Sequence, residues 1–526
     1  MFARIDAFVR DDRGQRAVAI AAVVVLVTAV ASFGATPKRT SSDRLSTGSE
    51  PGATSEEQSS PASSATPGTD AASSGGPRTG GVASPGRTPN LAAIPPALRG
   101  VDFGLRTQGV TPKSVKVGFS GNFDNCGDTA SLVQSLPPGI AGDPVKSINT
   151  FARYVNDHGG IGGRRYNPVI VQDGGSGCPD RNLPAAVKMA DQEKVFLAVP
   201  GLHVESDYII GRKVPVFGGR DDPASLRKYG PNGFALLEPI TETIDAWASF
   251  GRHHLKTTDK GGASPGCLIR ISNGASGNWD YPQKRLRADM ARYGIKFVDE
   301  YTFKDDIGSA QEQANAIAIR ERDKGCQHVY FLAGNFIGLI FVTDAATKNR
   351  WFPKKWTWTG YTYGVDDDRF AKTMDQVQWE NAEGLTYRLP PGASPFDGNC
   401  RRIYESYNGN DGNGESASVK IACGSVLTTA EIMRRGVRLT GRLDANSFVL
   451  GANAIRDDFF FDSHVPMAYS VPSSRGPFQT RAWRHYTVAE WSASQSRYLF
   501  PKYPCYYKTF GPNNAGCEDL RRFYRK

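Results

Sequence analysis

Short apolar runs alternate with amphipathic stretches over most of the chain after residue 110. The apolar run 115–119 is followed by Asp143 and Pro144, then by apolar positions at helical spacing up to Val155, and then by two glycines. This order predicts a strand, a capped helix and a helix stop. The pattern repeats, and the further ranges that we predict are strands at 166–171, 195–199, 267–271, 295–298 and 329–333, and helices at 183–192, 282–294 and 309–325.

Alternation of strands and helices predicts parallel, doubly wound sheets. Ser309 and Glu312 are spaced as a capping box at the start of one of the helices. The strand and helix series occurs twice, and the folded part of the chain is too long for one hydrophobic core. We therefore predict an α/β fold of two Rossmann-like lobes, whose ligands would lie outside the carboxyl ends of the strands.

The N-terminal segment predicts export. Four arginines, Arg4, Arg10, Arg13 and Arg16, precede an uncharged apolar stretch at 17–35. Such a stretch is a transmembrane anchor or a signal peptide, and the charge bias leaves residues 1–16 in the cytoplasm and the rest outside. Residues 29–31 could form a cleavage site, but the length of the apolar run favours an uncleaved anchor. Because no cysteine precedes Cys126, attachment of a lipid near the N-terminus is not expected.

Residues 36–98 are rich in Ser, Thr, Gly, Pro and Ala and contain no aromatic residue. Such a composition predicts a disordered linker, either a spacer or a dispensable low-complexity segment, ahead of a folded domain at 99–526. The whole chain is 39% hydrophobic and has a net charge of +10 without a long basic block. This dilute charge argues against a nucleic-acid partner and fits a protein near anionic lipid or wall polymer.

Three stretches carry a family resemblance: GVTPKSVKVGFSG at 109–121, FARYVNDHGGIGGRRYNPVIVQDGG at 151–175 and WENAEGLTYRLPP at 379–391. They resemble the type 1 periplasmic binding proteins that serve branched-chain amino-acid ABC transporters. The resemblance implies a Venus-flytrap, with two lobes joined by three crossings that close over a small ligand. The crossings are expected near residues 255, 385 and 455. Lobe 1 would then comprise 111–255 and 386–455, and lobe 2 would comprise 256–385 and 456–526.

The resemblance also implies where the ligand contacts lie. The family's amino-acid binders hold the ligand carboxylate on the loops after the third and fourth strands, and the ammonium on an aromatic residue and an acid of the second lobe. The residues of this chain that we expect to contact ligand are Asn122, Phe123, His203, Glu205, Ser206, Arg220, Asp221, Trp279, Tyr281, Asn335, Phe336, Tyr361 and Tyr363.

Two departures from the family pattern broaden the expected ligand. Asp221 lies where the amino-acid binders carry a small hydroxyl residue, and a carboxylate there would repel the carboxylate of an amino acid unless Arg220 compensates. The ammonium-binding Glu is absent near Tyr361 and Tyr363. The expected ligand is therefore small and polar: an amino acid, an amide, a polyol, or a sugar-like or cationic molecule.

Several of these residues have a purely structural alternative. Asp222 precedes Pro223, a pair typical of a helix N-terminus, and the neighbouring Asp221 shares that alternative. His203 and Glu205 could be solvated loop residues, and Trp279 with Tyr281 could be an aromatic staple on the following helix. The three tryptophans of a short predicted strand and its approach are expected to pack in the core, and they are Trp351, Trp356 and Trp358.

Eight cysteines in an exported chain predict disulfides. The loops after the first two strands hold one pair, and two more cysteines each precede a strand of the second lobe. The predicted bonds join neighbours in sequence: Cys126–Cys178, Cys267–Cys326, Cys400–Cys423 and Cys505–Cys517. A zinc site is not expected because no C-x2-C or close Cys/His set occurs. We expect neither metal nor cofactor.

Enzymatic activity is not expected. The segment GASPG at 262–266 matches G-x-S-x-G, but its serine precedes a predicted strand and is followed by proline, which is the wrong context for a nucleophile elbow. The sequence therefore predicts an exported solute-binding protein that captures a small polar ligand and presents it to an ABC permease. The alternatives are a membrane-tethered sensor or cell-surface recognition module with the same fold, and a scaffold with a degenerate cleft.

Overall fold

The computed structural model divides the chain into two units, Met1–Thr79 and Gly80–Lys526. It describes residues 82–83, 89–121, 123, 139–174, 178–200, 203–218, 230–234, 240–257, 265–272, 280–304, 309–332, 337–359, 365–380, 382–459, 461–462, 464, 467–468, 486–507 and 517–519. All of these belong to the second unit. No helix within these ranges is both long and apolar enough to span a bilayer. The predicted anchor at 17–35 lies outside them.

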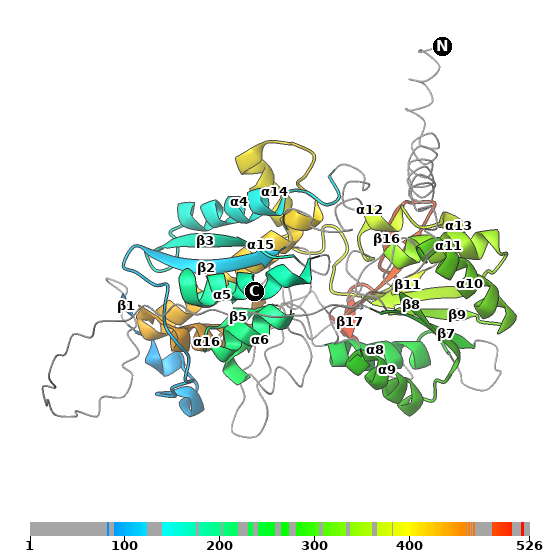
Figure 1. Cartoon of the computed structure of the whole chain (residues 1–526), viewed down its shortest axis with the longest axis horizontal. Coiled ribbons are helices and arrows are strands. Elements are labelled where there is room, and N and C mark those ends of the chain that lie inside the picture. Colours follow the sequence, from blue (N-terminus) through cyan, green and yellow to red (C-terminus); the bar gives the residue numbers. More distant parts are fainter. Residues whose placement is uncertain are drawn as a thin grey trace, which may run out of the picture. The chain divides into compact units, whose positions relative to one another are not determined.

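Lobe 1 is built on a five-stranded sheet in which every strand is parallel to its neighbours (Figure 1). The strand order is β3-β2-β4-β5-β6. The bounds are β2 Ser114–Gly121, β3 Arg165–Gln172, β4 Leu197–Val199, β5 Val216–Phe217 and β6 Gly233–Phe234. β2 is the second strand of the order and is paired on both sides, and its residues Val115, Val117 and Phe119 are buried. Fully buried parallel strands read as continuous apolar runs.

Helices cover both faces of the lobe 1 sheet. The helices on one face contribute Phe151 and Phe448 to a core shared with Val117 of β2, and they are α4 Pro144–Asp157, α15 Ala417–Thr440 and α16 Ala445–Asn453. α14 Asn399–Asn408 packs beside α4. The other face packs Ala186 and Ile209 against Val171, and its helical elements are α5 Asn182–Val187, the π-helical η4 Lys188–Gln192 and α6 His203–Gly211. Lobe 1 is therefore a three-layer α/β sandwich.

Lobe 2 contains a seven-stranded sheet of order β16-β15-β11-β10-β9-β7-β8. Its bounds are β7 Gly266–Ser272, β8 Phe297–Lys304, β9 His328–Leu332, β10 Lys355–Thr359, β11 Glu383–Thr386, β15 Thr487–Ser492 and β16 Arg497–Leu499. β15 runs antiparallel to β11 and to β16, while the other neighbours are parallel. The predicted fold class of two doubly wound α/β lobes is confirmed.

The lobe 2 sheet also has helices on both faces (Figure 1). One face packs against α8 Ile240–His253 and α9 Asp280–Arg292, through residues that include Trp247 and Tyr330. The other face packs against α10 Ala310–Asp323, α11 Ile337–Lys348 and α13 Gln376–Trp379. Trp351, Trp356 and Trp358 are buried on this second face, as the core-packing interpretation predicted. A four-residue helix, α12 Asp368–Ala371, follows β10.

The helix ends test two predicted caps. Asp143 caps α4 as predicted, since its Oδ1 accepts a hydrogen bond from the Lys146 amide at 2.9 Å and Pro144 follows in the first turn. The capping box predicted at Ser309 and Glu312 is wrong. The Ser309 side chain makes no capping bond, and its hydroxyl accepts a hydrogen bond from Gln313 Nε2 at 2.8 Å.

The chain first crosses between the lobes earlier than the sequence predicted. α8 packs on lobe 2, where Trp247 Nε1 donates to Thr357 Oγ1 of β10 at 3.1 Å. The first crossing therefore lies between Phe234 and Ile240 and not near residue 255, because an amphipathic pattern does not show which of two sheets its helix covers. The second crossing follows β11, and the third separates α16 from β15.

Part of the predicted linker is packed against lobe 1. Two short 3-10 helices occupy Leu91–Ala93 and Pro96–Leu98, and Ile94 and Leu98 are buried in the lobe 1 core. In addition, β1 Val82–Ala83 pairs antiparallel with β12 Arg442–Leu443. The folded region therefore begins before the predicted boundary at residue 99, because Ile94 and Leu98 pack into the hydrophobic core of lobe 1.

Three predicted disulfides are confirmed: Cys267–Cys326, Cys400–Cys423 and Cys505–Cys517, with Cα–Cα distances of 5.8, 5.7 and 5.1 Å. Cys178 is also disulfide-bonded, and its predicted partner Cys126 lies outside the described residues. A bond that closes a loop of this kind stabilises a fold by about 2 to 4 kcal/mol. The disulfides thus have a structural role, because each one covalently links two segments of the folded chain.

Candidate functional site

Buried polar side chains gather at the carboxyl end of the lobe 1 sheet. Ser120, near the end of β2, donates a 2.5 Å hydrogen bond to Glu205 Oε2, and Glu205 lies in the first turn of α6 directly after β4. Glu205 is 0% exposed, and the neighbouring Ser206 is equally buried. The alternative that Glu205 is a solvated loop residue is therefore wrong. Its carboxylate is positioned by the two adjacent strands, β2 and β4, where ligands bind in this class of sheet.

The residues that follow β3 are hydrogen-bonded to the carboxyl end of β2 and to the start of α5. The Asp173 amide donates to Gly121 O at 3.0 Å, and the Gly174 amide donates to Asn182 Oδ1 at 3.0 Å. A Cβ atom on Gly174 would collide with the carbonyl oxygen of Cys178, so a side chain cannot be accommodated there. Phe123, a predicted ligand contact, is half-buried against the lobe 1 core. The hydrogen bonds of Asp173 and Gly174 thus connect the end of β3 to the end of β2 and to the start of α5.

Most of the other predicted ligand contacts cannot be placed. Those that lie outside the described residues are Asn122, Arg220, Asp221, Trp279, Asn335, Phe336, Tyr361 and Tyr363. His203 is the first residue of α6 and Tyr281 is near the start of α9, but their side chains are also outside the described part. Of the predicted set, the structure places the side chains of Phe123, Glu205 and Ser206, all in lobe 1.

In lobe 2, the last two residues of β10 each carry a buried polar side-chain atom. Trp358 Nε1 and Thr359 Oγ1 are both on residues that are 0% exposed, and neither atom has a hydrogen-bond partner in the described part of the chain. A buried polar group without a partner costs about 1 to 3 kcal/mol. Since Thr359 is at the carboxyl end of the sheet, its hydroxyl is a candidate for hydrogen bonding to a ligand. Thr359 is not among the ligand contacts predicted from the sequence.

An acidic run follows the same strand and was also missed. Asp366 accepts from Thr386 Oγ1 at 2.6 Å, and the Arg388 side chain donates to the Asp366 carbonyl oxygen. Asp367 is 8% exposed and is paired with Arg369 at 3.0 Å and with Lys420 at 2.6 Å. Three consecutive aspartates followed by arginine are visible in the sequence, and that run is the signal that could have drawn attention to this cluster.

The cluster joins the two lobes. Lys420 is on α15 of lobe 1, whereas Asp367 belongs to lobe 2. Arg369 Nη1 also donates to Gly139 O of lobe 1 at 3.0 Å. The next residue, Ile140, is 5% exposed and packs with the lobe 2 core. An ion pair, a hydrogen bond and an apolar contact therefore hold the lobes together beside the carboxyl ends of both sheets.

Burial and neighbouring charges act in opposition on these acids. Burial raises the pKa of Asp366, and Arg388 and Thr386 only partly offset it. Burial also acts to raise the pKa of Asp367, but Lys420 and Arg369 overcome it and hold that pKa well below the usual range. The pKa of Arg388 is raised, because three aspartates outweigh the effect of its burial. The cluster therefore contains firmly ionised groups at neutral pH.

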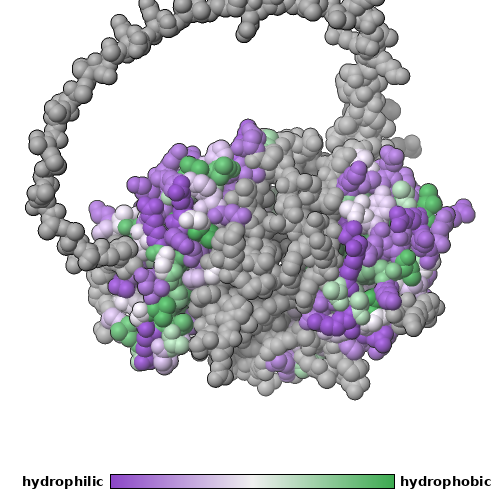
Figure 2. All heavy atoms as spheres, turned by 60° about the horizontal axis from the view of Figure 1, so that its bottom comes forward, coloured by the Kyte–Doolittle hydropathy of each residue, from purple (hydrophilic) through white to green (hydrophobic). Residues whose placement is uncertain are grey.

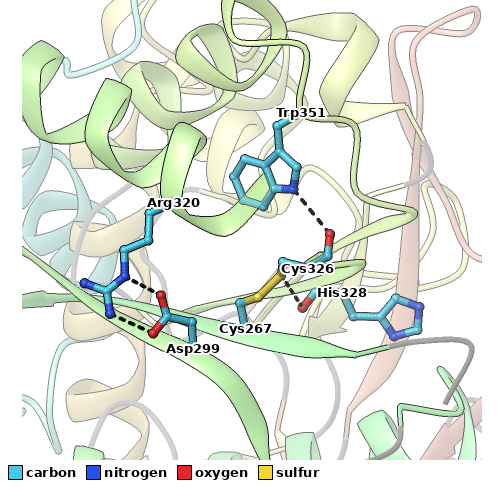
Figure 3. Close-up of a disulfide and its surroundings, with 6 residues drawn as sticks. All are labelled: Cys267, Asp299, Arg320, Cys326, His328 and Trp351. Carbon is cyan, nitrogen blue, oxygen red and sulfur yellow. Dashed lines mark hydrogen bonds and ion pairs between the residues drawn. A yellow bond between two sulfur atoms is a disulfide. The ribbon is translucent and has the colours of Figure 1, made fainter. Parts of the chain in front are cut away.

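One group among the described residues has the residue types of a metal site. Cys267, Cys326 and Glu321 place ligand atoms within 4.8 Å of one another, and all three are buried. The two sulfur atoms are joined to each other, so they offer no thiolate to a metal (Figure 3). Burial and the charge of Asp299 raise the pKa of Glu321 to about 8. Glu321 is therefore a protonated acid next to a structural disulfide.

A groove of about 640 Å³ lies elsewhere on lobe 1, between α4 and the amino-terminal half of β3. Its lining includes Arg153, Arg165 and Asn167. It is at the end of the sheet opposite to the buried polar residues of β2. On the face shown in Figure 2, polar and apolar side chains are interspersed over the described surface. The carboxyl ends of the sheets remain the candidate site.

Solved structures share this architecture at low sequence identity. A substrate-binding protein of an ABC transporter from Aeropyrum pernix has a TM-score of 0.57 and 13% identity, over 74% of this chain and 95% of that one. A branched-chain amino-acid ABC transporter protein from Thermus thermophilus with bound valine has a TM-score of 0.56 and 14% identity, over 74% and 96%. A solute-binding protein from R. palustris in complex with benzoate has a TM-score of 0.52 and 15% identity, over 74% and 95%.

No protein-family model matches the chain, and no curated protein matches it at a significant level. The structural likeness nevertheless defines the class of fold. The two-lobed α/β architecture, with parallel sheets and three crossings, is the fold of type 1 periplasmic binding proteins.

Proposed function

We propose that this chain is an extracytoplasmic solute-binding protein that captures a small polar ligand between its lobes and presents it to an ABC transporter. The observation that carries the proposal is the placement of buried polar groups at the carboxyl ends of both sheets. Ser120 and Glu205 supply them in lobe 1, and Thr359 supplies one in lobe 2. Enclosing a polar ligand between such groups replaces its water with fixed hydrogen-bonding partners.

The proposed ligand carries at least one hydrogen-bonding group that reaches Thr359. The related structures bind valine in one case and benzoate in another, so the fold accepts both aliphatic and aromatic molecules. Asp221 and the absent acid near Tyr361 distinguish this chain from the amino-acid pattern. An amide, polyol or sugar-like ligand, or an amino acid held in a different way, fits these residues.

We further propose that residues 17–35 anchor the chain in the membrane, with the folded unit outside. The uncharged run after four arginines supports this topology. N-terminal sequencing of the mature protein from a membrane fraction tests it, because a mature chain beginning near residue 32 in the soluble fraction would show a cleaved signal peptide.

A membrane-tethered sensor is the second candidate. The observation that favours it is the uncharged run at 17–35 after four arginines, which would tether the folded unit through a protein segment. Permease and ATPase genes next to this one, or a permease that co-purifies with the chain, would favour transport. A chain that binds solute but associates with a signalling protein would favour sensing.

A thermal-shift screen of the full-length protein tests the binding function. The screen compares amino acids, amides, polyols, sugars and aromatic carboxylates. A ligand at 100 times its dissociation constant stabilises the folded state by about 2.7 kcal/mol, which moves the melting temperature by several degrees. Thr359→Val is the site control, because it removes the hydroxyl and keeps the side-chain volume. No response to any class, from protein that unfolds cooperatively, would overturn the proposal.

A further inference from the structure

We propose that the C-terminal hairpin is a brace on the hinge, which limits the opening and closing of the lobes. The hairpin consists of β17 Cys505–Tyr507 and β18 Cys517–Asp519, joined by the disulfide Cys505–Cys517. The proposal rests on the proposed binding function for its purpose, since closure is how a two-lobed binder captures ligand. Its structural basis is independent of any ligand.

The three crossings between the lobes meet at one buried cluster. Thr243 follows the first crossing, Tyr387 lies in the second and Tyr486 ends the third. The Thr243 hydroxyl is 3.1 Å from the Tyr387 hydroxyl, and Tyr486 donates to Thr243 Oγ1 at 3.3 Å. The two tyrosine rings are in contact, with centroids 5.3 Å apart. All three residues are at most 5% exposed, so the contacts are shielded from water.

The third crossing is also bound to the second through the backbone. Thr487 Oγ1 donates to Arg388 O at 2.5 Å and to Thr386 O at 3.2 Å. Arg388 forms an isolated antiparallel bridge with His464, which lies within the third crossing. Two of the three hinge segments therefore move as one unit unless these bonds break.

The hairpin holds this unit from the C-terminal side. The Tyr486 amide donates to Tyr507 O at 3.0 Å, and the Tyr507 amide donates back to Tyr486 O at 2.8 Å. Tyr506 and Tyr507 are 0% and 1% exposed and pack in the core that contains Tyr387 and Tyr486. Tyr506 also donates to Glu518 Oε2 at 2.9 Å. An isolated two-stranded hairpin is marginal in water, so the disulfide and this docking keep it ordered.

Rotation of the lobes changes backbone angles at the crossings, because hinges absorb domain motion at a few residues. A hairpin paired with the last residue of the third crossing opposes those changes. The brace therefore sets the population of the closed state in the absence of ligand, and through that population it sets the apparent affinity.

The test compares two double variants of the full-length protein. Cys505→Ser with Cys517→Ser releases the hairpin, whereas Cys267→Ser with Cys326→Ser removes a disulfide in the core cluster of lobe 2, which is separate from the cluster that contains Tyr387 and Tyr486. Hydrogen–deuterium exchange is measured on peptides that contain residues 384–390 and 486–490. We expect exchange at both peptides to accelerate by about tenfold in the first variant and to be unchanged in the second.

A second measurement follows the lobes directly without ligand. Fluorophores are attached through non-canonical amino acids at Ile421 of lobe 1 and Ile319 of lobe 2, which are 45% and 43% exposed. Single-molecule energy transfer then reports the distribution of distances between the lobes. We expect the distribution to broaden in the hairpin variant and to keep its wild-type width in the variant that lacks Cys267–Cys326.

Tyr486→Phe with Tyr387→Phe provides a test that leaves all disulfides intact. These changes remove the hydroxyl contacts with Thr243 and keep the packed rings, so the hinge peptides should exchange about threefold faster. Wild-type exchange and an unchanged distance distribution in both hinge variants would overturn the brace. That result would leave the binding proposal standing, and a ligand screen without hits would leave the brace standing, because neither hinge measurement uses ligand.

Discussion

Two buried acids of lobe 2 are held in opposite protonation states. Asp367 is 8% exposed and is ionised, because Lys420 and Arg369 surround it and lower its pKa. Glu321 is 0% exposed and is protonated at neutral pH, because burial and the nearby charge of Asp299 raise its pKa to about 8. Arg320 is close by, but it is bound to Asp299 (Figure 3).

The difference shows that burial alone does not decide the charge of an acid in this fold. Asp367 stays ionised because Lys420 of lobe 1 and Arg369 of lobe 2 both pair with it, whereas Glu321 is buried beside the Cys267–Cys326 disulfide. A buried acid keeps its charge where cations pair with it, and it is neutralised where its burial is not compensated. The following predictions test this contrast.

The largest expected effect is that of Asp367→Asn. The change leaves Lys420, Arg369 and Arg388 close together without their shared carboxylate, and loss of one partner of a buried ion pair costs about 3 to 5 kcal/mol. The free energy of unfolding is measured by chemical denaturation. Because the folded pKa is lowered, this stabilisation is present above the ordinary pKa of Asp and is lost as the pH falls below it.

Asp323→Asn is the matched control for that measurement. Asp323 is paired with Arg322, but the two side chains are 62% and 44% exposed. An exposed pair contributes about 0 to 1 kcal/mol. Equal losses in the two variants would contradict the contrast, since they would show that the Asp367 cluster is no more than a surface ion pair.

Glu321→Gln should have the next largest effect on the free energy of unfolding, and it should stabilise the protein where Asp367→Asn destabilises it. The folded pKa of about 8 lies above the ordinary value of a carboxyl, so the protonated form stabilises the fold at low pH and this contribution is lost as the pH rises toward 8. The neutral amide of glutamine does not ionise, so the variant keeps this stabilising contribution at every pH. We expect the variant to match wild type near pH 4.5 and to be more stable by about 3 kcal/mol near pH 7.

The same pH series with Glu312→Gln gives the control, because Glu312 is exposed on the same helix, α10. A Glu321→Gln variant that is less stable than wild type at pH 7 would show that the carboxylate is ionised and paired, which is contrary to its assigned state.

Lys420→Met removes the charge that comes from lobe 1 and keeps the aliphatic stem. Arg369 still faces Asp367, so we expect a loss of only about 1 kcal/mol at low salt. The difference from wild type should shrink in 1 M salt, which screens the pair in the wild type. A difference that does not change with salt would mean that Lys420 acts through packing alone.

Thr359→Val should have the smallest effect on stability. The hydroxyl is buried and has no partner in the described part of the chain, so its removal should leave the fold unchanged or stabilise it by about 1 kcal/mol. Affinity for any ligand found in the screen should fall at least tenfold, or about 1.4 kcal/mol. A destabilised variant with unchanged affinity would assign Thr359 to the core.

The alternation of elements was the most predictable part of the structure. The strand predicted at 115–119 is the centre of β2, and the predicted cap at Asp143 is present. Nearest-neighbour pairing also identified the three disulfides that the structure describes. These features depend on local periodicity, on side chains next to a helix end, or on cysteines that adjacent elements bring together.

The parts that were missed depend on contacts between distant segments. The pattern of α8 shows an apolar face, but only the packed Trp247 shows that lobe 2 covers it. Likewise, Asp367 and Lys420 are unremarkable charged residues until the fold places them 2.6 Å apart. The Ser309 hydroxyl accepts from the side chain of Gln313 and makes no capping bond. Sequence spacing carries none of this information.

The connectivity of lobe 1 constrains how the chain can be made. Its sheet is complete at Phe234, yet one face of that sheet is covered by α15 and α16, which end at Asn453. A polypeptide that leaves the ribosome or a translocation pore N-terminus first therefore has only α4 on this face of the sheet until the whole of lobe 2 up to β11 has followed. Production of this protein should accordingly depend on factors that shield nascent apolar surface, even though the finished molecule buries it completely.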